Sequence, residues 1–305
     1  MRFGAVFPQA EVGAADAGAL RDYAQAVQGL GFVDLLAFDH VLGASTDFYR
    51  DAKLTGPYRE KHSFREPFVL FGFLAAAAPK LAFATNVLIL PQRQTVLVAK
   101  QAAEVDLLCG GRLRLGIGIG WNPVEYEALG IPFKERAARE EEQIRLMREL
   151  WTRPLVTFEG RYHRVVEAGL NPLPIQRPIP IWLGGMAEAV LKRVGTLADG
   201  WFPLFASTGA VKTQAMPVRQ ESPEELVERV RGYAREAGRD PAKIGLGCRL
   251  TFAGQTPEDW GRHLELFRKV GATHVAVNTM GAGLQSLDAH VAALRRVAEA
   301  TGLRA

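Results

Sequence analysis

Short apolar segments alternate with helical patterns along the whole chain, and this alternation limits the possible folds more than any other feature. Eight segments have the length and composition of β-strands: residues 3–7, 34–38, 81–90, 112–119, 179–185, 200–204, 243–252 and 273–278. A helical pattern follows each of them, over residues 17–30, 66–78, 95–109, 136–152, 187–198, 223–237, 257–270 and 284–300. Apolar strands that alternate with helices form parallel sheets covered on both faces.

Eight strand–helix units predict an α/β fold, specifically a (β/α)8 TIM barrel in which residues 1–305 form a single domain. A doubly wound open sheet is the main alternative, because the number of strands does not show that the sheet closes. Three connections are unusually long, at residues 41–65, 153–178 and 205–221, and the second contains a predicted hairpin. The first and third follow strand ends. We expect them to be lids or pocket walls at the carboxyl-terminal face, with surface insertions that lack a function as the alternative.

The composition is that of an ordinary globular protein. Lys and Arg total 37 against 33 Asp and Glu, and the basic residues are mixed with acidic ones, so no nucleic-acid surface is predicted. The chain has neither a long apolar run typical of a membrane span nor a secretory signal pattern, which favours the cytoplasm. Cys109 and Cys248 are expected to be buried free thiols, and no spacing typical of a metal site occurs.

Asp39 and His40 stand together where the second predicted strand ends. Ionisable residues at the carboxyl end of a barrel strand are typical of an active site. Histidine suits proton transfer near neutral pH, and a neighbouring carboxylate can fix its tautomer. We therefore predict a catalytic role for this pair, with a capping Asp beside an exposed His as the alternative.

The third and fourth predicted strands contain polar and small residues where an ordinary strand would be apolar. Asn86 interrupts the third strand and marks either a ligand contact or a strand irregularity. In the fourth strand, Gly116, Gly118 and Gly120 share one face, because strand side chains alternate. Such a face can admit a planar ring close to the backbone. A layer of small residues in the barrel interior is the alternative.

The fifth predicted strand ends at Gly184 and Gly185, immediately before a helix. Backbone N–H groups at the start of a helix can bind phosphate, and Lys192 or Arg193 would assist if the first turns bring them near. A plain strand–helix turn is the alternative. No arrangement typical of serine hydrolases, nucleotide-binding P-loops or zinc proteases is present in the sequence.

Taken together, these segments resemble the luciferase-like monooxygenase superfamily, and within it the coenzyme F-420-dependent oxidoreductases. The resemblance rests on LLAFDHVLG, on the stretch from ATNVLILPQRQ through LGIGIGWNPVEYEALG to MRELWT, on VTFEGRYH, and on PIPIWLGGMAEAVLKRVGTLADGWFP. These segments cover about residues 33–203. The resemblance implies a (β/α)8 barrel that binds its cofactor at the carboxyl ends of the strands.

The resemblance also implies individual site residues. His40 would donate or accept a proton near the reactive ring atom, and Asp39 would contact the ring system. The bond between Asn86 and Val87 matches a position where many members have a non-prolyl cis peptide, which forms a bulge behind the ring. The full set of implied cofactor-binding positions is Asp39, Asn86, Val87, Gly118, Gly120, Trp121, Gly184 and Gly185.

One departure from the family pattern concerns a second acid. Some relatives have a catalytic glutamate where Trp121 stands here. Glu125 is close to that position in sequence and is a candidate to replace it.

The leading functional hypothesis is hydride transfer between reduced deazaflavin coenzyme F-420 and a small organic substrate. One alternative is an FMN-dependent monooxygenase that works with a separate flavin reductase, because both cofactors share ring shape and phosphate anchoring. Others are a non-catalytic flavin-binding homologue and a barrel lyase or aldolase, although no predicted strand ends in the lysine that a Schiff base requires. The family resemblance further implies a homodimer formed through the helices of the second and third units.

Overall fold

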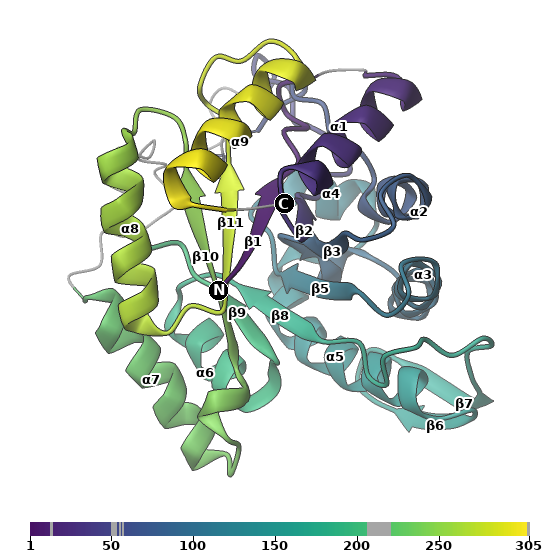
Figure 1. Cartoon of the computed structure of the whole chain (residues 1–305). Coiled ribbons are helices and arrows are strands. Elements are labelled where there is room, and N and C mark those ends of the chain that lie inside the picture. Colours follow the sequence, from purple (N-terminus) through teal and green to yellow (C-terminus); the bar gives the residue numbers. More distant parts are fainter. Residues whose placement is uncertain (13–14, 50–53, 55, 57, 206–220, 304–305) are drawn as a thin grey trace.

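The chain folds into a closed barrel of parallel strands surrounded by helices (Figure 1). This computed structural model describes residues 1–12, 15–49, 54, 56, 58–205 and 221–303. The strands of the barrel are β1 (Arg2–Val6), β2 (Asp34–Ala37), β3 (Ala82–Thr85), β4 (Leu88–Ile89), β5 (Leu113–Gly118), β8 (Ile181–Gly184), β9 (Gly200–Phe202), β10 (Gly245–Thr251) and β11 (His274–Asn278). All their pairings are parallel.

Closure of the barrel depends on the third predicted strand. Its two halves, β3 and β4, both pair with β5, through Phe83 with Leu113 and Leu88 with Ile117. β3 pairs with β2 on its other side, so the sheet has no free edge at this point. The predicted TIM barrel is therefore confirmed, and the open doubly wound sheet is wrong.

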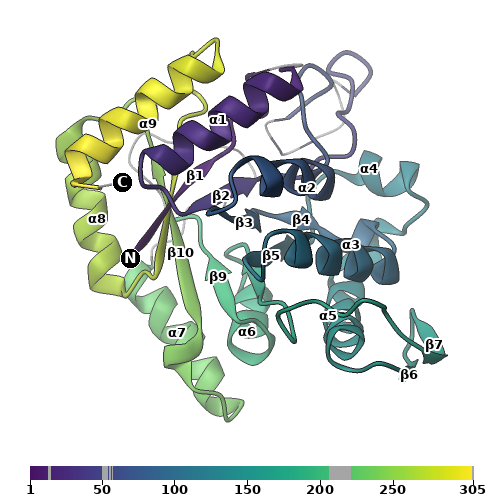
Figure 2. The ribbon, with the colours of Figure 1, turned by 45° about the vertical axis from the view of Figure 1, so that its right-hand side comes forward.

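The helices cover the outside of the barrel, as two views related by a rotation show (Figures 1 and 2). They are α1 (Ala17–Gly29), α2 (Pro67–Ala77), α3 (Thr95–Leu108), α4 (Pro123–Ala128), α5 (Arg136–Thr152), α6 (Glu188–Leu197), α7 (Pro223–Glu236), α8 (Pro257–Val270) and α9 (Leu287–Thr301). The short α4 was not predicted. Among the described residues, no helix is long and apolar enough to cross a membrane.

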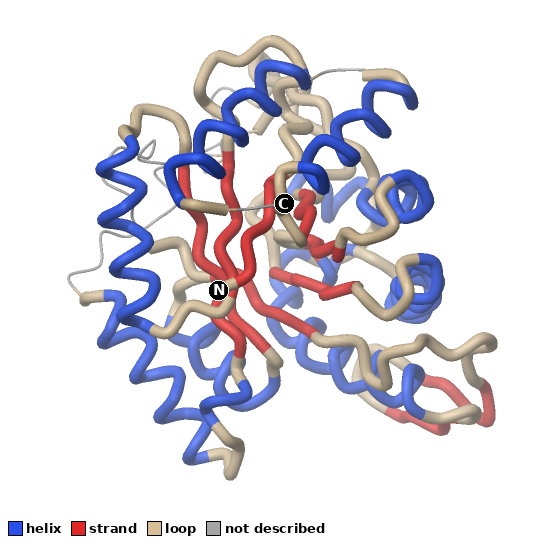
Figure 3. Tube along the Cα trace, in the orientation of Figure 1, coloured by secondary structure: helices blue, strands red, loops and turns tan. Residues whose placement is uncertain are grey.

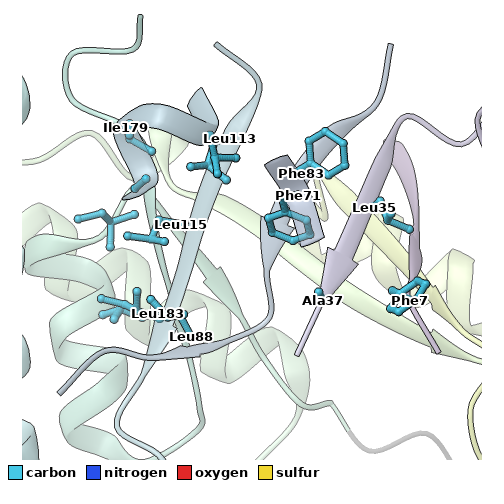
Figure 4. Packing of buried hydrophobic residues seen from close by; sticks show 14 of the residues in the cluster. Phe7, Leu35, Ala37, Phe71, Phe83, Leu88, Leu113, Leu115, Ile179 and Leu183 are labelled. Carbon is cyan, nitrogen blue, oxygen red and sulfur yellow. The ribbon is translucent and has the colours of Figure 1, made fainter. Parts of the chain in front are cut away.

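The hydrophobic residues form two layers. The outer layer lies between strands and helices, where Phe71 of α2 packs against Phe83 of β3 with ring centroids 5.1 Å apart (Figure 4). The inner layer fills the barrel, and we call it the barrel-interior cluster. Its members are Val6, Leu36, Phe38, Ala84, Trp182, Phe202, Ala276 and Met280.

The connection at residues 153–178 contains the predicted hairpin, formed by β6 (Val156–Glu159) and β7 (Arg164–Ala168). It extends from the barrel beside α5 (Figure 3). Of the other long connections, residues 206–220 lie outside the described residues, and 41–65 is described in part. Their predicted roles as lids or pocket walls stay predictions. Cys109 and Cys248 are buried and free, as predicted.

Candidate active site

His40 lies just beyond the end of β2, at the barrel mouth, which is the end where the carboxyl termini of the strands meet. Its side chain is 10% exposed. Three aromatic rings surround the imidazole edge-on: Tyr58 at 5.2 Å, Phe64 at 4.7 Å and Trp121 at 5.6 Å between ring centroids. The imidazole is therefore fixed in an aromatic pocket rather than free in solvent.

The carboxylate that contacts His40 is Glu125 of α4. Nδ1 of His40 lies 3.2 Å from Oε1 of Glu125, which is almost fully buried. The same oxygen accepts the backbone N–H of Val41 at 2.8 Å and that of Leu42 at 3.3 Å. Since an ionised carboxylate only accepts hydrogen bonds, it favours the tautomer with a proton on Nδ1 and leaves Nε2 as the second nitrogen for chemistry.

Asp39 is adjacent to His40 in sequence but its carboxylate binds other groups. Oδ2 accepts the backbone N–H of Ile89 at 2.9 Å, and Oδ1 accepts Nη2 of Arg93 at 2.7 Å. Arg93 also donates to Glu66 at 3.1 Å. The carboxylate that can fix the tautomer of His40 is therefore Glu125, and not Asp39 as the sequence suggested. Contact between Asp39 and the cofactor, and its catalytic role, stay predictions.

A cavity of about 690 Å³ opens beside His40. This volume is within the usual range for small-molecule sites. Its lining combines apolar side chains, including Phe64 and Ile131, with polar ones from the start of α3 and from the hairpin. Asp39 and His40 are the two predicted site residues that line it; Asn86, Val87, Gly118, Gly120, Trp121, Gly184 and Gly185 are not among the residues that line this cavity.

The glycine face of β5 is filled by neighbouring side chains. A Cβ atom added to Gly118 would lie 2.8 Å from Cγ2 of Val87, and one added to Gly184 would lie 2.7 Å from Cγ1 of the same residue. At Gly120 the neighbour is Cγ2 of Ile89, at 2.7 Å. The structure thus brings Val87, Gly118 and Gly184 together, but the prediction of a face left open is wrong. Their contact with a cofactor stays a prediction.

The peptide bond between Asn86 and Val87 is cis, at the position that the family resemblance implied. It lies between β3 and β4 and interrupts the predicted third strand. Of the two interpretations of Asn86, a strand irregularity is therefore confirmed, and contact with a ligand stays a prediction.

Gly184 and Gly185 lead into α6, as predicted, and Gly185 has φ 126°. Ala187 precedes the helix and provides no side-chain hydrogen bond to the first turn. This leaves backbone N–H groups for an anion. The Nε of Arg193 donates to Glu141 at 2.7 Å, so this side chain is bound to α5.

The sequence reasoning missed two groups at the cavity. Arg93 was not singled out because it precedes a helix with no unusual sequence feature. Its position shortly after the interrupted third strand could have indicated that it lies near the site. His163 of the hairpin lies with Nε2 2.6 Å from Oγ1 of Thr95 and Nδ1 2.7 Å from Glu142. These two contacts of His163 fix the hairpin against α3 and α5. Because the three residues are distant in sequence, only the fold reveals the contact.

The family profile described as luciferase-like monooxygenase matches residues 1–301. The chain therefore belongs to this family.

Individual relatives match over shorter stretches. An uncharacterized protein of Mycobacterium tuberculosis is 42% identical over 138 residues, 45% of this chain and 47% of the relative. An FMNH2-dependent dimethylsulfone monooxygenase of Pseudomonas putida is 33% identical over 153 residues, 49% of this chain and 42% of the relative. The matches thus span about half the length of these relatives.

Among solved structures, a coenzyme F420-dependent tetrahydromethanopterin reductase from Methanopyrus kandleri superimposes with a TM-score of 0.70. The superposition covers 97% of each chain at 16% sequence identity. At this identity the likeness concerns the fold.

Proposed function

We propose that this protein transfers hydride between reduced deazaflavin coenzyme F-420 and a small organic substrate, with His40 as the proton donor or acceptor. The observation that carries the proposal is the contact between His40 and Glu125 at the wall of the cavity. Hydride transfer to a carbonyl requires a proton for its oxygen, and hydride removal from an alcohol releases one, so a histidine oriented by a carboxylate suits the role of proton donor or acceptor.

The residues at the barrel mouth fit a ring cofactor with a phosphate group. The backbone N–H groups at the uncapped start of α6, after Gly185, would bind the phosphate. Val87 would support the ring, and the aromatic side chains around His40 would exclude water. Asp39 and Arg93 hold the β2 end against β4. The bound cofactor would supply the two-electron chemistry, and the protein orients the reactants.

An FMN-dependent monooxygenase is the second candidate function. The observation that favours it is the 33% identity with a relative named as FMNH2-dependent. In that case a separate flavin reductase would supply reduced FMN, and the same barrel mouth would hold the ring and the phosphate.

A binding titration separates the two candidates. Purified protein is titrated with F-420 and with FMN, and the affinity and the absorption spectrum of the bound form are measured. Tight binding of F-420, with weak binding of FMN, is expected. The reverse order, together with oxygen uptake when reduced FMN is present, would favour the monooxygenase.

Replacing His40 tests the catalytic proposal. His40→Ala is expected to lower the rate of substrate turnover about hundredfold or more, because it removes the proton-transfer group. Cofactor affinity and the melting temperature are measured in parallel and are expected to change little. An unchanged rate would contradict the role of His40 in proton transfer, whereas a wild-type protein that binds cofactor without turnover would support the non-catalytic alternative.

We further propose that the protein is a homodimer formed through α2 and α3. Large apolar side chains on these two helices are exposed to solvent: Val69, Phe73, Val96, Leu97 and Leu108. The two helices lie side by side on one flank of the barrel (Figures 1 and 2). Exposed apolar patches of this kind mark protein interfaces, which supports the dimer that the family resemblance implied.

A further inference from the structure

Arg249 of β10 faces the inside of the barrel. Side chains of a strand alternate between faces, so Gly245, Gly247 and Arg249 share one side. A Cβ atom added to Gly245 would lie 2.3 Å from Trp182, and one added to Gly247 would lie 2.6 Å from Phe202. Trp182 and Phe202 belong to the barrel-interior cluster. Arg249 also pairs in register with Ala276, another member of that cluster.

The charge of Arg249 has no acidic partner among the residues that the structure describes. The other partly buried arginines of the barrel differ in this respect: Arg93 binds Asp39 at 2.7 Å, and Arg114 binds Asp34 at 3.1 Å. Burial lowers the pKa of Arg249, and the nearby phenol of Tyr58 offsets part of this lowering.

Tyr58 itself does not supply a negative charge, because burial raises the pKa of its phenol. A cation placed in the interior without a counter-charge destabilises the folded protein. Such costly charges are typical of functional sites, where a ligand supplies the missing partner.

Tyr58 also lies beside the proposed catalytic residue, since the centroid of its ring is 5.2 Å from that of the His40 imidazole. We propose that Arg249 binds an anionic group (a carboxylate, sulfonate or phosphate) of a ligand that occupies the barrel mouth beside His40. The anion belongs either to the cofactor or to the substrate. The part of this inference that places the ligand at His40 rests on the proposed function. The anion site itself does not.

The anion site is tested without catalysis. Arg249→Met removes the charge, Arg249→Lys keeps it, and Arg268→Met on the exposed side of α8 is the matched control. Thermal unfolding is measured in increasing sodium sulfate, with sodium chloride at equal ionic strength as the reference. A ligand that binds only the folded protein raises its melting temperature.

We expect a saturable sulfate-dependent increase in the wild type, in Arg249→Lys and in Arg268→Met, and its loss in Arg249→Met. In chloride, Arg249→Met is expected to melt at the same temperature as the wild type or higher, because an unpaired, partly buried charge has been removed. Equal sulfate protection of the wild type and Arg249→Met would contradict the proposal. Failure of both Arg249 variants to fold would assign a structural role to Arg249 and would also overturn it.

Cofactor titrations then identify the source of the anion. If the anion is part of the cofactor, Arg249→Met is expected to weaken F-420 or FMN binding about tenfold or more, the usual effect of losing a charge-assisted hydrogen bond. If it is part of the substrate, cofactor affinity stays unchanged, and sulfate binds cofactor-loaded wild type but not cofactor-loaded Arg249→Met. A wild type that binds neither cofactor would refute the proposed function, while the sulfate experiment would still decide the role of Arg249.

Discussion

At the scale of single residues, the site depends on which carboxylate reaches His40. Asp39 is the neighbour in sequence, but adjacent residues at a strand end point in different directions. Asp39 therefore contacts β4 and Arg93, whereas Glu125, far away along the chain, contacts His40. A sequence pattern can identify the histidine and propose both acids. It does not reveal which acid is the partner, because that depends on how α4 packs over the end of β2.

This geometry predicts the effect of Glu125→Gln. The amide oxygen can still accept the backbone N–H groups of Val41 and Leu42, so the loop should remain in place. The negative charge that favours a proton on Nδ1 of His40 is lost, and the rate of turnover is expected to fall about tenfold to hundredfold.

Nitrogen NMR of the imidazole, on protein without cofactor, provides a readout separate from activity. The wild type should show Nδ1 of His40 protonated, and Glu125→Gln should show a mixture of tautomers. Glu127→Gln, at an exposed position of the same helix, is the control. An unchanged tautomer in Glu125→Gln would contradict the role assigned to Glu125.

At the scale of elements, the strands and helices were predictable because their apolar residues repeat with the periods of buried strands and amphipathic helices. The division of the third strand into β3 and β4 was predicted only as one possible meaning of Asn86. The glycines in and just after β5 were recognised as a special face, but its occupants are Val87, which lies between β3 and β4, and Ile89 of β4. A sequence shows where space is left and does not show which side chain fills it.

Helix α5 contains an acid on its buried face, which also carries Ile144 and Met147. Glu140 is 2% exposed, and its Oε1 has no hydrogen-bond partner in the described part of the chain. Burial raises the pKa of Glu140 from 4.5 to about 7. Above pH 7 the side chain is ionised in both folded and unfolded protein, so the folded state bears the full cost of the buried charge.

Glu140→Gln is therefore expected to stabilise the protein at pH 8, by up to roughly 3 kcal/mol. The gain should shrink as the pH falls from about 7 and vanish below 4.5, where the carboxyl is neutral in both states. Chemical denaturation across this pH range measures the effect, with Glu149→Gln on the same helix as the control. A gain that is independent of pH would show that burial of the charge is not its cause.

At the scale of the whole molecule, closure of the barrel brings residues from distant parts of the chain to one mouth. His40, Glu125 and Arg249 come from three different strand–helix units, and parallel strands place all of them toward the same end. The barrel itself was predictable from the repeating units. The position of Arg249 on the inner face was not recognised, because a single arginine in an apolar strand resembles an ordinary surface residue in the sequence.

The proposed dimer is also tested at this scale. Val69→Glu combined with Leu108→Glu places charges within the exposed apolar surface of α2 and α3, and is expected to convert a dimer into monomers. Sedimentation velocity measures the change, and Val166→Glu on the exposed hairpin is the control. A wild type that sediments as a monomer at all concentrations would refute this interface.

The packing of Val87 between Gly118 and Gly184 has a consequence for how this barrel can diverge. The side-chain volume that fits at each of these three positions depends on the other two, because Cβ atoms added at the two glycines would lie within 2.8 Å of the methyl groups of Val87. A bulkier residue at either glycine is tolerable only if position 87 shrinks in the same variant. A redesign of these positions should therefore use paired substitutions, in which a larger side chain at one position is matched by a smaller one at another. A single larger side chain would force the backbone segments apart.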